Sequence, residues 1–205
     1  MRRRHLLWTV VFAGLIATSA HAVNLNWVGG GADSNWSTGA NWDPTDTNPT
    51  GDALYYDATV LIPAGAVNGV VDASYNVAGL RFDNANWAVS GDRLYTIQIP
   101  SGTTLTVSGA LDVGRHFTSW VSSNFGNHKL VTARFTSGGQ LTVNGPVTVR
   151  NSGPDYPRAA AKLDVSGLSR FTVDTTGRIE LGGANNGAGE LILSPDNLLR
   201  AAGIY

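Results

Sequence analysis

The sequence predicts an all-β fold on the basis of its composition, its apolar–polar alternation and an internal repeat. Only 14% of the residues are charged, whereas glycine accounts for 25 of the 205. Helix surfaces favour Glu, Lys, Ala and Gln, and a chain with so few charges supplies little of that material. Gly and Asn instead suit the tight turns that join short strands. We therefore expect many short strands connected by turns.

Three similar units show apolar and polar residues in alternation. Each unit has two short strands separated by a turn, and the units begin at Leu105, Leu141 and Phe171, which are 36 and then 30 residues apart. Repeats of this length are typical of solenoids, propellers and arrays. Because the side-chain period of a strand is two, one set should share a core and the other should face outwards. The inward set is Leu105, Val107, Leu141, Val143, Phe171 and Val173, and the outward set is Thr106, Thr142 and Thr172.

A right-handed parallel β-helix with an N-terminal Trp-rich cap is the architecture that this spacing favours. Such a solenoid stacks each coil on the last and buries a continuous apolar core. A β-sandwich or jelly roll would give the same alternation and stays open as the alternative. Further strands are expected at 67–71, 77–82, 87–89 and 94–99, with loops at 43–52, 115–129 and 151–157.

The N-terminus has the three parts of a cleaved secretory signal. Arg2 to Arg4 form the positive region, 6–17 the apolar core, and Ala20-His21-Ala22 the cleavage site. An apolar run of about 12 residues is short for a bilayer span, which needs roughly 20. We expect cleavage after Ala22, a mature chain that begins at Val23, and no transmembrane segment after cleavage. Secretory and twin-arginine export routes both stay open.

The charge of the mature chain excludes some classes of partner. Residues 1–22 contain three of the 14 Lys+Arg residues and none of the 15 Asp+Glu residues, so their removal leaves a net charge of about −4. Binding to nucleic acid or to an anionic membrane surface needs clustered positive charge. We therefore expect no nucleic-acid partner. The chain contains no cysteine, so it has no disulfides and no thiolate metal ligands.

The most distinctive stretch is the tryptophan segment at 24–43. Trp27, Trp36 and Trp42 each follow an asparagine, with glycine and serine between them. One interpretation is an aromatic platform for sugars. The other is a cap, in which the indoles cover the open end of the core and polar neighbours accept their N–H groups. We favour the cap, because a solenoid must cover its ends to avoid pairing through exposed strand edges.

Short motifs follow one another through most of the mature chain. They are WVGG at 27–30, NWS at 35–37, ANW at 40–42, VAGLRF at 77–82, GTTLTV at 102–107, LDVSGLSRF at 163–171 and GELILSPDN at 189–197. In this order they resemble exported β-helical proteins of Planctomycetes and Verrucomicrobia, which have autotransporter-associated β-strand repeats or are PEP-CTERM-type surface proteins. The resemblance implies a β-helical surface or passenger-like protein, and it carries over no catalytic residues.

Catalysis is not expected, although β-helices include polysaccharide lyases and hydrolases. Glycoside hydrolysis needs two converging carboxylates, and the chain has no Asp-Asp pair. Asp112, Asp164 and Asp174 alternate with apolar residues, which predicts a solvated strand face. The motifs of Ser hydrolases, phosphate loops and zincins are absent from the sequence.

No cofactor and no metal site is predicted. Asp43, Asp46, Asp52 and Asp57 could offer oxygens to Ca²⁺, but they match no EF-hand or RTX spacing, so we interpret them as turn-capping residues. His116 and His128 lie in the 115–129 loop without a third ligand at recognisable spacing. The residues predicted to contact a ligand are Trp87, Trp120 and His116.

Together these features predict an exported structural or adhesive surface module, located at the cell surface or in the medium. Its partners would be extracellular polysaccharides or other surface proteins. A carbohydrate-binding or polysaccharide-degrading β-helix is the alternative. The expected organisation is a signal peptide at 1–22, a Trp/Gly-rich cap segment at 23–60, and a β-strand repeat domain at 61–205. An ending on apolar residues without a polar cap predicts that this domain is truncated at its C-terminus.

Overall fold

The computed structural model confirms that the protein is all-β. The one helix in the described residues is a single 3-10 turn, η1 (Gly39–Asn41). The predicted signal peptide, residues 1–22, lies outside the described residues, as do the predicted strand at 87–89 and the predicted loops at 115–129 and 151–157. The structure describes residues 23–56, 69–83, 92–114, 130–150, 160–174, 177–182, 188–195, 197 and 203–204.

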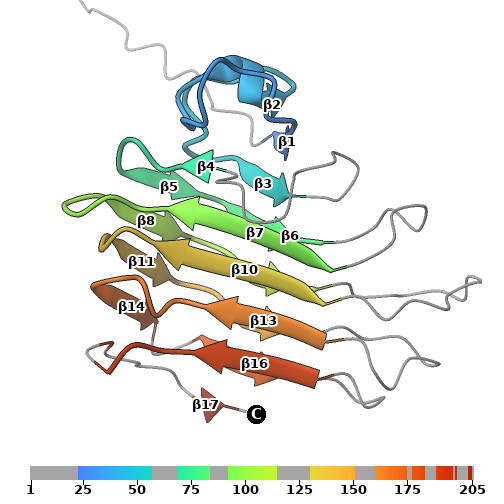
Figure 1. Ribbon diagram of the computed structural model, residues 1–205, viewed down its shortest axis with the longest axis vertical. Coiled ribbons are helices and arrows are strands. Elements are labelled where there is room, and N and C mark those ends of the chain that lie inside the picture. Colours follow the sequence, from blue (N-terminus) through green and yellow to red (C-terminus); the bar gives the residue numbers. More distant parts are fainter. Residues whose placement is uncertain are drawn as a thin grey trace, which may run out of the picture.

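The strands form three sheets (Figure 1). The eight-stranded sheet has the order β17 (Gly203–Ile204), β15 (Arg178–Leu181), β12 (Val147–Val149), β9 (Leu111–Val113), β6 (Gly79–Phe82), β3 (Ala53–Tyr56), β1 (Asn24–Trp27), β2 (Trp42–Asp43). The five-stranded sheet has the order β16 (Ala188–Ile192), β13 (Ala160–Asp164), β10 (Val131–Thr136), β7 (Arg93–Gln98), β4 (Gly69–Val70). The four-stranded sheet has the order β14 (Arg170–Val173), β11 (Gln140–Val143), β8 (Thr104–Val107), β5 (Tyr75–Val77).

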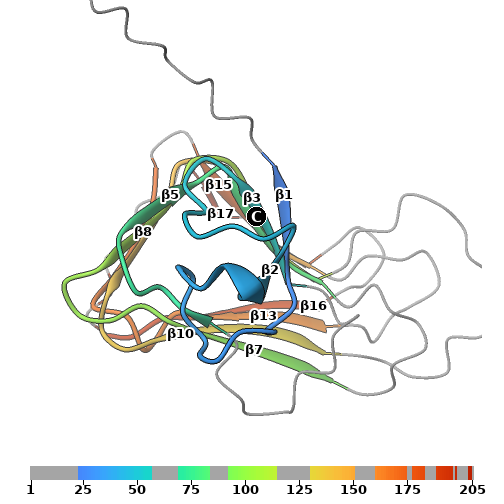
Figure 2. The ribbon, with the colours of Figure 1, turned by 90° about the horizontal axis from the view of Figure 1, so that it is seen from above.

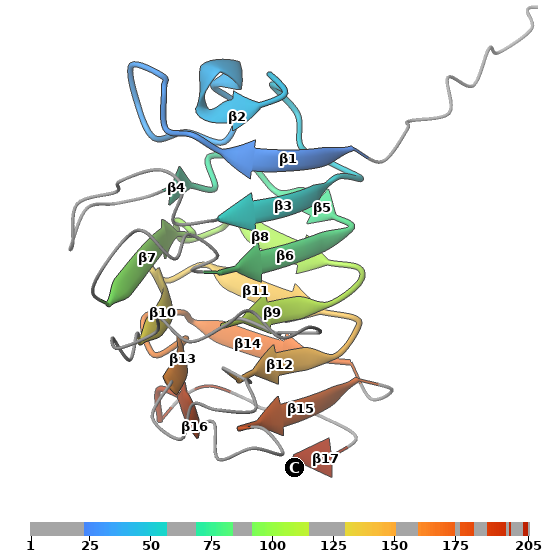
Figure 3. The same cartoon turned by 90° about the vertical axis from the view of Figure 1, so that its right-hand side faces the viewer.

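The chain visits the sheets in a repeating order. From β4 to β15 it contributes one strand to the five-stranded sheet, one to the four-stranded sheet and one to the eight-stranded sheet, and then begins again. Strands three places apart in the sequence therefore pair, and among the pairings of the named strands only β1 with β2 is antiparallel. Seen from above, the three sheets form the sides of a triangle around a common interior (Figure 2). The eight-stranded sheet runs along the whole length of the stack (Figure 3).

The register confirms the internal repeat. Leu141 pairs with Leu105 on one side and with Phe171 on the other, so the spacings of 36 and 30 residues are the steps between stacked strands. The six residues predicted to point inwards are all fully buried, while Thr106, Thr142 and Thr172 are half-buried on the opposite face. The second strands of the three units stack in the same way, with Val147 between Leu111 and Ile179. Apolar side chains therefore form continuous ladders along the core.

One strand prediction is wrong in detail. Residues 77–82 were expected to form a single strand, but the structure has β5 ending at Val77 and β6 beginning at Gly79, in different sheets. Val77 and Leu80 are both buried although they lie three residues apart, and a straight strand would place them on opposite faces. A corner at Ala78 lets both side chains enter the core.

The segment before β3 lies over one end of the stack. β1 pairs in parallel with β3, β2 pairs with β1, and η1 immediately precedes β2. Figure 2 shows this segment crossing the interior of the triangular outline. The strands β1 and β3 were not predicted, because polar and glycine-rich neighbours hide the short alternation at 24–27 and 53–56.

Candidate functional site

The three residues singled out for ligand contact lie outside the described residues. Trp87 belongs to the segment that connects β6 to β7, and His116 and Trp120 belong to the segment that connects β9 to β10. The strands at the ends of these segments are direct neighbours, because β6 pairs with β9 and β7 pairs with β10. The described strands on either side of these segments are therefore neighbours in both the eight-stranded and the five-stranded sheet. Their role in binding stays a prediction.

The tryptophans of the N-terminal segment are buried. The exposed fractions of their side chains are 4% for Trp27, 0% for Trp36 and 2% for Trp42. The indole Nε1 of Trp36 donates a hydrogen bond to the Tyr56 hydroxyl at 2.9 Å, and Nε1 of Trp42 donates to the carbonyl oxygen of Trp36 at 2.9 Å. The interpretation of these rings as a platform for sugars is wrong, because no ring face is open to a ligand. They form part of the core.

Aromatic contacts connect the tryptophans to the strands β3 and β6. Trp27 stacks on Tyr56 with ring centroids 5.3 Å apart, and Tyr56 stacks on Phe82 at 5.2 Å. Trp42 meets Trp27 edge-on at 4.9 Å. Such pairs add stability beyond the area that they bury. Burial raises the pKa of the Tyr56 hydroxyl well above its usual value, so this group stays neutral and accepts the Trp36 hydrogen bond.

Polar side chains hold the loop that carries these rings. Asn41 is fully buried, and its Oδ1 accepts a hydrogen bond from the Gly31 amide at 2.8 Å. Its Nδ2 donates to the carbonyl oxygens of Asp33 and Asn35 at 3.0 and 2.9 Å. The hydrogen bond from the Thr38 hydroxyl, followed by that from the Asn35 amide, lowers the pKa of Asp33. Hydrogen bonds made by its own side chains therefore hold the loop in this conformation.

Of the aspartates interpreted as turn-capping residues, Asp46 has this role, whereas Asp43 lies on β2 and the Asp52 side chain accepts a hydrogen bond from a residue 29 positions away. Asp46 Oδ1 accepts a hydrogen bond from the Asn48 amide at 2.6 Å, which is the geometry of an Asx turn. Asp52 Oδ1 accepts one from the Val23 amide at 2.7 Å. Asp57 lies outside the described residues. Across the described part of the chain, no group of three or more His, Cys, Asp or Glu side chains is arranged to hold a metal ion.

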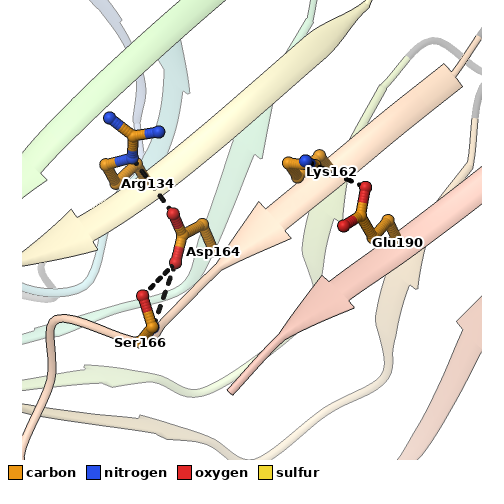
Figure 4. Close-up of polar contacts among 5 residues, drawn as sticks. All are labelled: Arg134, Lys162, Asp164, Ser166 and Glu190. Carbon is orange, nitrogen blue, oxygen red and sulfur yellow. Dashed lines mark hydrogen bonds and ion pairs between the residues drawn. The ribbon is translucent and has the colours of Figure 1, made fainter. Parts of the chain in front are cut away.

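Ion pairs connect neighbouring strands on the outer face of the five-stranded sheet. Arg134 Nε lies 3.1 Å from Asp164 Oδ2, and Lys162 Nζ lies 2.9 Å from Glu190 Oε2 (Figure 4). Each pair joins two residues that face each other in the register of neighbouring strands. On the eight-stranded sheet, Glu180 contacts two guanidinium groups, that of Arg150 at the end of the neighbouring strand β12 and that of Arg178 on its own strand.

Asp164 departs from the prediction of a solvated strand face. It is only 8% exposed, and its Oδ1 accepts hydrogen bonds from the amide and the hydroxyl of Ser166 at 3.1 and 2.6 Å. Burial acts to raise the pKa of this carboxyl, but the Ser166 hydrogen bonds and Arg134 outweigh it, so the pKa is lowered. The alternation placed Asp164 on the correct face, but the neighbouring coil and the Ser166 turn cover it. Asp112 is half-buried and Asp174 is exposed.

The outer face of the four-stranded sheet differs from the other two. Its central column, in register across four strands, consists of Asn76, Thr106, Thr142 and Thr172. Every ion pair between described residues lies on the five-stranded or the eight-stranded sheet. This neutral column therefore presents hydroxyl and amide groups at the spacing of β-strands, about 4.7–4.9 Å. Sequence alternation had predicted that the threonines face outwards, but their alignment in one column needed the sheet assignment, and the exposed Arg170 and Asp174 flank Thr172 on the same face.

Comparisons with known proteins do not suggest a function for this chain. No family model, curated protein or solved structure matches the chain. Within the described residues, no helix has the length and apolar character needed to cross a bilayer.

Proposed function

We propose that this chain is an exported structural or adhesive surface module, built as a right-handed parallel β-helix. The observation that carries the proposal is the stacking of strands three places apart around one core. This arrangement gives an elongated body whose length grows with the number of coils and whose outer faces are rows of surface side chains. A protein of that kind suits support or attachment over a distance.

The N-terminal segment acts as the cap of the β-helix in this proposal. β1 covers the free edge of β3, and Trp27, Trp36 and Trp42 cover the aromatic end of the core. An uncovered edge of parallel strands would offer unpaired backbone groups to other chains. The antiparallel strand β2 then ends the sheet, because it interrupts the parallel pairing that would continue the stack.

No catalytic role belongs to this proposal. Four described carboxylates, those of Asp83, Asp164, Glu180 and Glu190, are engaged in ion pairs with arginine or lysine. A glycosidase needs a carboxylic acid and a second carboxylate positioned on opposite sides of one bond. Asp164, Glu180 and Glu190 pair with a residue that lies on or next to a neighbouring strand, and Asp83 pairs with Arg81 two residues away.

The experiment is to express residues 1–205 in a bacterial host, fractionate the cells, and sequence the N-terminus of the recovered protein. We expect the protein outside the cytoplasm with Val23 as its first residue. The same material, incubated with plant and algal polysaccharides, should release no new reducing ends. Cytoplasmic protein that begins at Met1 would overturn the export proposal, and the release of reducing ends would replace the structural role with an enzymatic one.

A carbohydrate-binding function is the second candidate, and the neutral column of Asn76, Thr106, Thr142 and Thr172 favours it. Hydroxyl and amide groups can donate and accept hydrogen bonds with the hydroxyls of an uncharged polysaccharide. The test is a pull-down with an insoluble neutral glucan, comparing the parent with the Thr106→Val, Thr142→Val, Thr172→Val triple variant. Thr148→Val, on the eight-stranded sheet, is the matched control. Binding lost in the triple variant and kept in the control supports this candidate, and equal binding by all three chains contradicts it.

A further inference from the structure

The backbone nitrogen of Val23 lies against a buried carboxylate. It donates a hydrogen bond to Asp52 Oδ1 at 2.7 Å, and Asp52 is only 6% exposed. The same two segments are joined again by the Ala53 amide, which donates to the Val23 carbonyl oxygen at 3.0 Å. The backbone carbonyl oxygen of Asp52 also accepts a hydrogen bond from the Ala78 amide at 2.7 Å. Asp52 therefore sits where β1, β3 and the following coil meet.

Asp52 has no cationic partner among the described residues. The ion pairs of those residues involve other carboxylates. A buried carboxylate is costly unless hydrogen bonds or an opposite charge compensate it. The group that could supply this positive charge is the Val23 nitrogen, which donates a hydrogen bond to Asp52.

Two independent observations concern Val23. The signal pattern that ends in Ala20-His21-Ala22 predicts Val23 as the first residue of the mature chain, and the structure places its nitrogen on Asp52. In the precursor this nitrogen is an amide with one N–H and no charge. Hydrolysis of the Ala22–Val23 bond by a signal peptidase and one water leaves a carboxylate on Ala22 and an α-ammonium on Val23.

We propose that Asp52 is the receptor for the new N-terminus, and that its ion pair with the Val23 α-ammonium completes the cap after signal removal. A charge-assisted hydrogen bond is shorter and stronger than one from a neutral amide. The pair joins the start of β1 to the start of β3, so its formation holds the whole N-terminal segment against the first coil. Processing and closure of the cap are thereby coupled.

The inference rests on the export part of the proposed function, but its test does not depend on export. Four chains are prepared with defined N-termini: one begins at Val23 and one carries a Gly-Ser extension before Val23, each with Asp52 or with Asp52→Asn. Hydrogen exchange of the backbone amides of β1 and β3 is measured at pH 6.5. With Asp52, the free N-terminus should slow exchange about tenfold relative to the extended chain, as a stronger charge-assisted bond requires.

The two Asp52→Asn chains and a surface variant complete the design. With Asp52→Asn the extension should make no difference, whereas in Asp43→Asn, an exposed residue on β2, the tenfold difference should persist. Equal exchange of free and extended chains with Asp52 would overturn the proposal, and so would a difference that survives the Asp52→Asn substitution. N-terminal sequencing of the exported protein separately tests the cleavage site.

A pH series keeps the test decisive if Asp52→Asn fails to fold. The carboxylate should raise the pKa of the Val23 amine above its usual value of about 7.7–8.0. The extra protection should therefore be complete below about pH 7 and disappear as the pH rises through that raised pKa. The other titratable groups on the strands beside β1 are Asp43, Tyr55 and Tyr56. Burial raises the pKa of Tyr56 and keeps its hydroxyl neutral in this range, and the same series on Asp43→Asn and Tyr55→Phe chains controls for the other two groups. Protection that does not change between about pH 6 and 10 would contradict the ion pair.

Discussion

At the residue scale, Asp164 connects two coils and a turn through one carboxylate. Oδ2 faces Arg134 of the preceding coil, and Oδ1 accepts two hydrogen bonds from Ser166 (Figure 4). Replacing it by alanine leaves the Ser166 amide and hydroxyl without this acceptor. Loss of buried hydrogen-bond partners costs more than loss of an exposed side chain.

We expect Asp164→Ala to lower the free energy of unfolding by about 1–3 kcal/mol because its donors lose their acceptor. Asp112→Ala is the matched control, since Asp112 is also an outward strand aspartate but is half-buried. Its cost should stay within about 0.5 kcal/mol, as for ordinary surface positions. Denaturant unfolding of both variants is the measurement. Equal losses in the two variants would show that the contacts of Asp164 do not contribute specifically.

The lowered pKa of Asp164 also predicts a pH dependence. A carboxyl whose pKa is lower in the folded state stabilises the protein above its unfolded pKa, and this contribution is lost as the pH falls through the folded pKa. The stability difference between the parent and Asp164→Asn should therefore be constant above about pH 5 and shrink as the pH falls below about 4. Urea unfolding at several pH values measures it. A difference that grows towards acid pH would have the wrong sign.

At the scale of the element, close approach between turns limits the side chains that a coil can accept. The turn between β11 and β12 contains Gly145, where an added Cβ would lie 2.4 Å from the carbonyl oxygen of Gly109 in the neighbouring turn. That oxygen belongs to the backbone and cannot move without shifting the coil. At Gly79, the first residue of β6, an added Cβ would meet the nearest atom at 3.6 Å, an ordinary contact.

Gly145→Ala should therefore destabilise the protein by about 1–3 kcal/mol through overpacking between coils. Gly79→Ala, which fits without a clash, should cost clearly less. Neither residue has a positive φ, so the comparison isolates steric contact from backbone strain. Thermal and denaturant unfolding of the pair give the result. A Gly79→Ala variant that is as unstable as Gly145→Ala would contradict the steric explanation.

The tryptophan segment depends on one hydroxyl of β3. Tyr56→Phe removes the acceptor of the Trp36 indole N–H and leaves that donor buried, so we expect a loss of about 1–3 kcal/mol. Tyr55→Phe removes the same hydroxyl from the neighbouring, half-buried residue and should be nearly neutral. Hydrogen exchange of β1 and β3 would localise the effect. Identical behaviour of the two variants would mean that the indole bond adds no stability.

At the scale of the whole molecule, the two ends of the stack are built differently. The N-terminal end is covered by β1, β2 and buried indoles, whereas Leu181, Leu191 and Leu193 at the other end are only partly buried against the core. Aromatic residues concentrate near the covered end, where Trp27, Tyr56 and Phe82 stack in sequence. The solubility of the molecule should therefore depend on the covering segment.

Deletion of residues 23–43 should expose the edge of β3 together with Tyr56. We expect a shift from monomer to larger species with rising concentration, because a free apolar strand edge pairs with other chains. Size-exclusion chromatography with light scattering measures the mass, and the chain beginning at Val23 is the control. A deletion variant that keeps its β-sheet circular dichroism and stays monomeric at every concentration would contradict the capping role.

The sequence alone determined the all-β class and the register of the repeat. Leu105, Leu141 and Phe171 could be aligned from their spacing, because an apolar ladder in a parallel stack must repeat with the length of each coil. The burial of Trp36 and Trp42 also followed the cap interpretation. The proposed ligand contacts at Trp87, Trp120 and His116 lie outside the described residues and remain predictions.

Only the tertiary structure decided which polar groups meet. Arg134 and Asp164 are 30 residues apart, and Val23 and Asp52 are 29 apart, so their contacts depend on coil length and on the path of each corner. The alternation of a strand gives the face of a side chain, but burial on that face is set by the neighbouring coil. For the same reason the neutral column of the four-stranded sheet became visible only once the strands were assigned to sheets, since its members come from four strands that the chain visits one at a time.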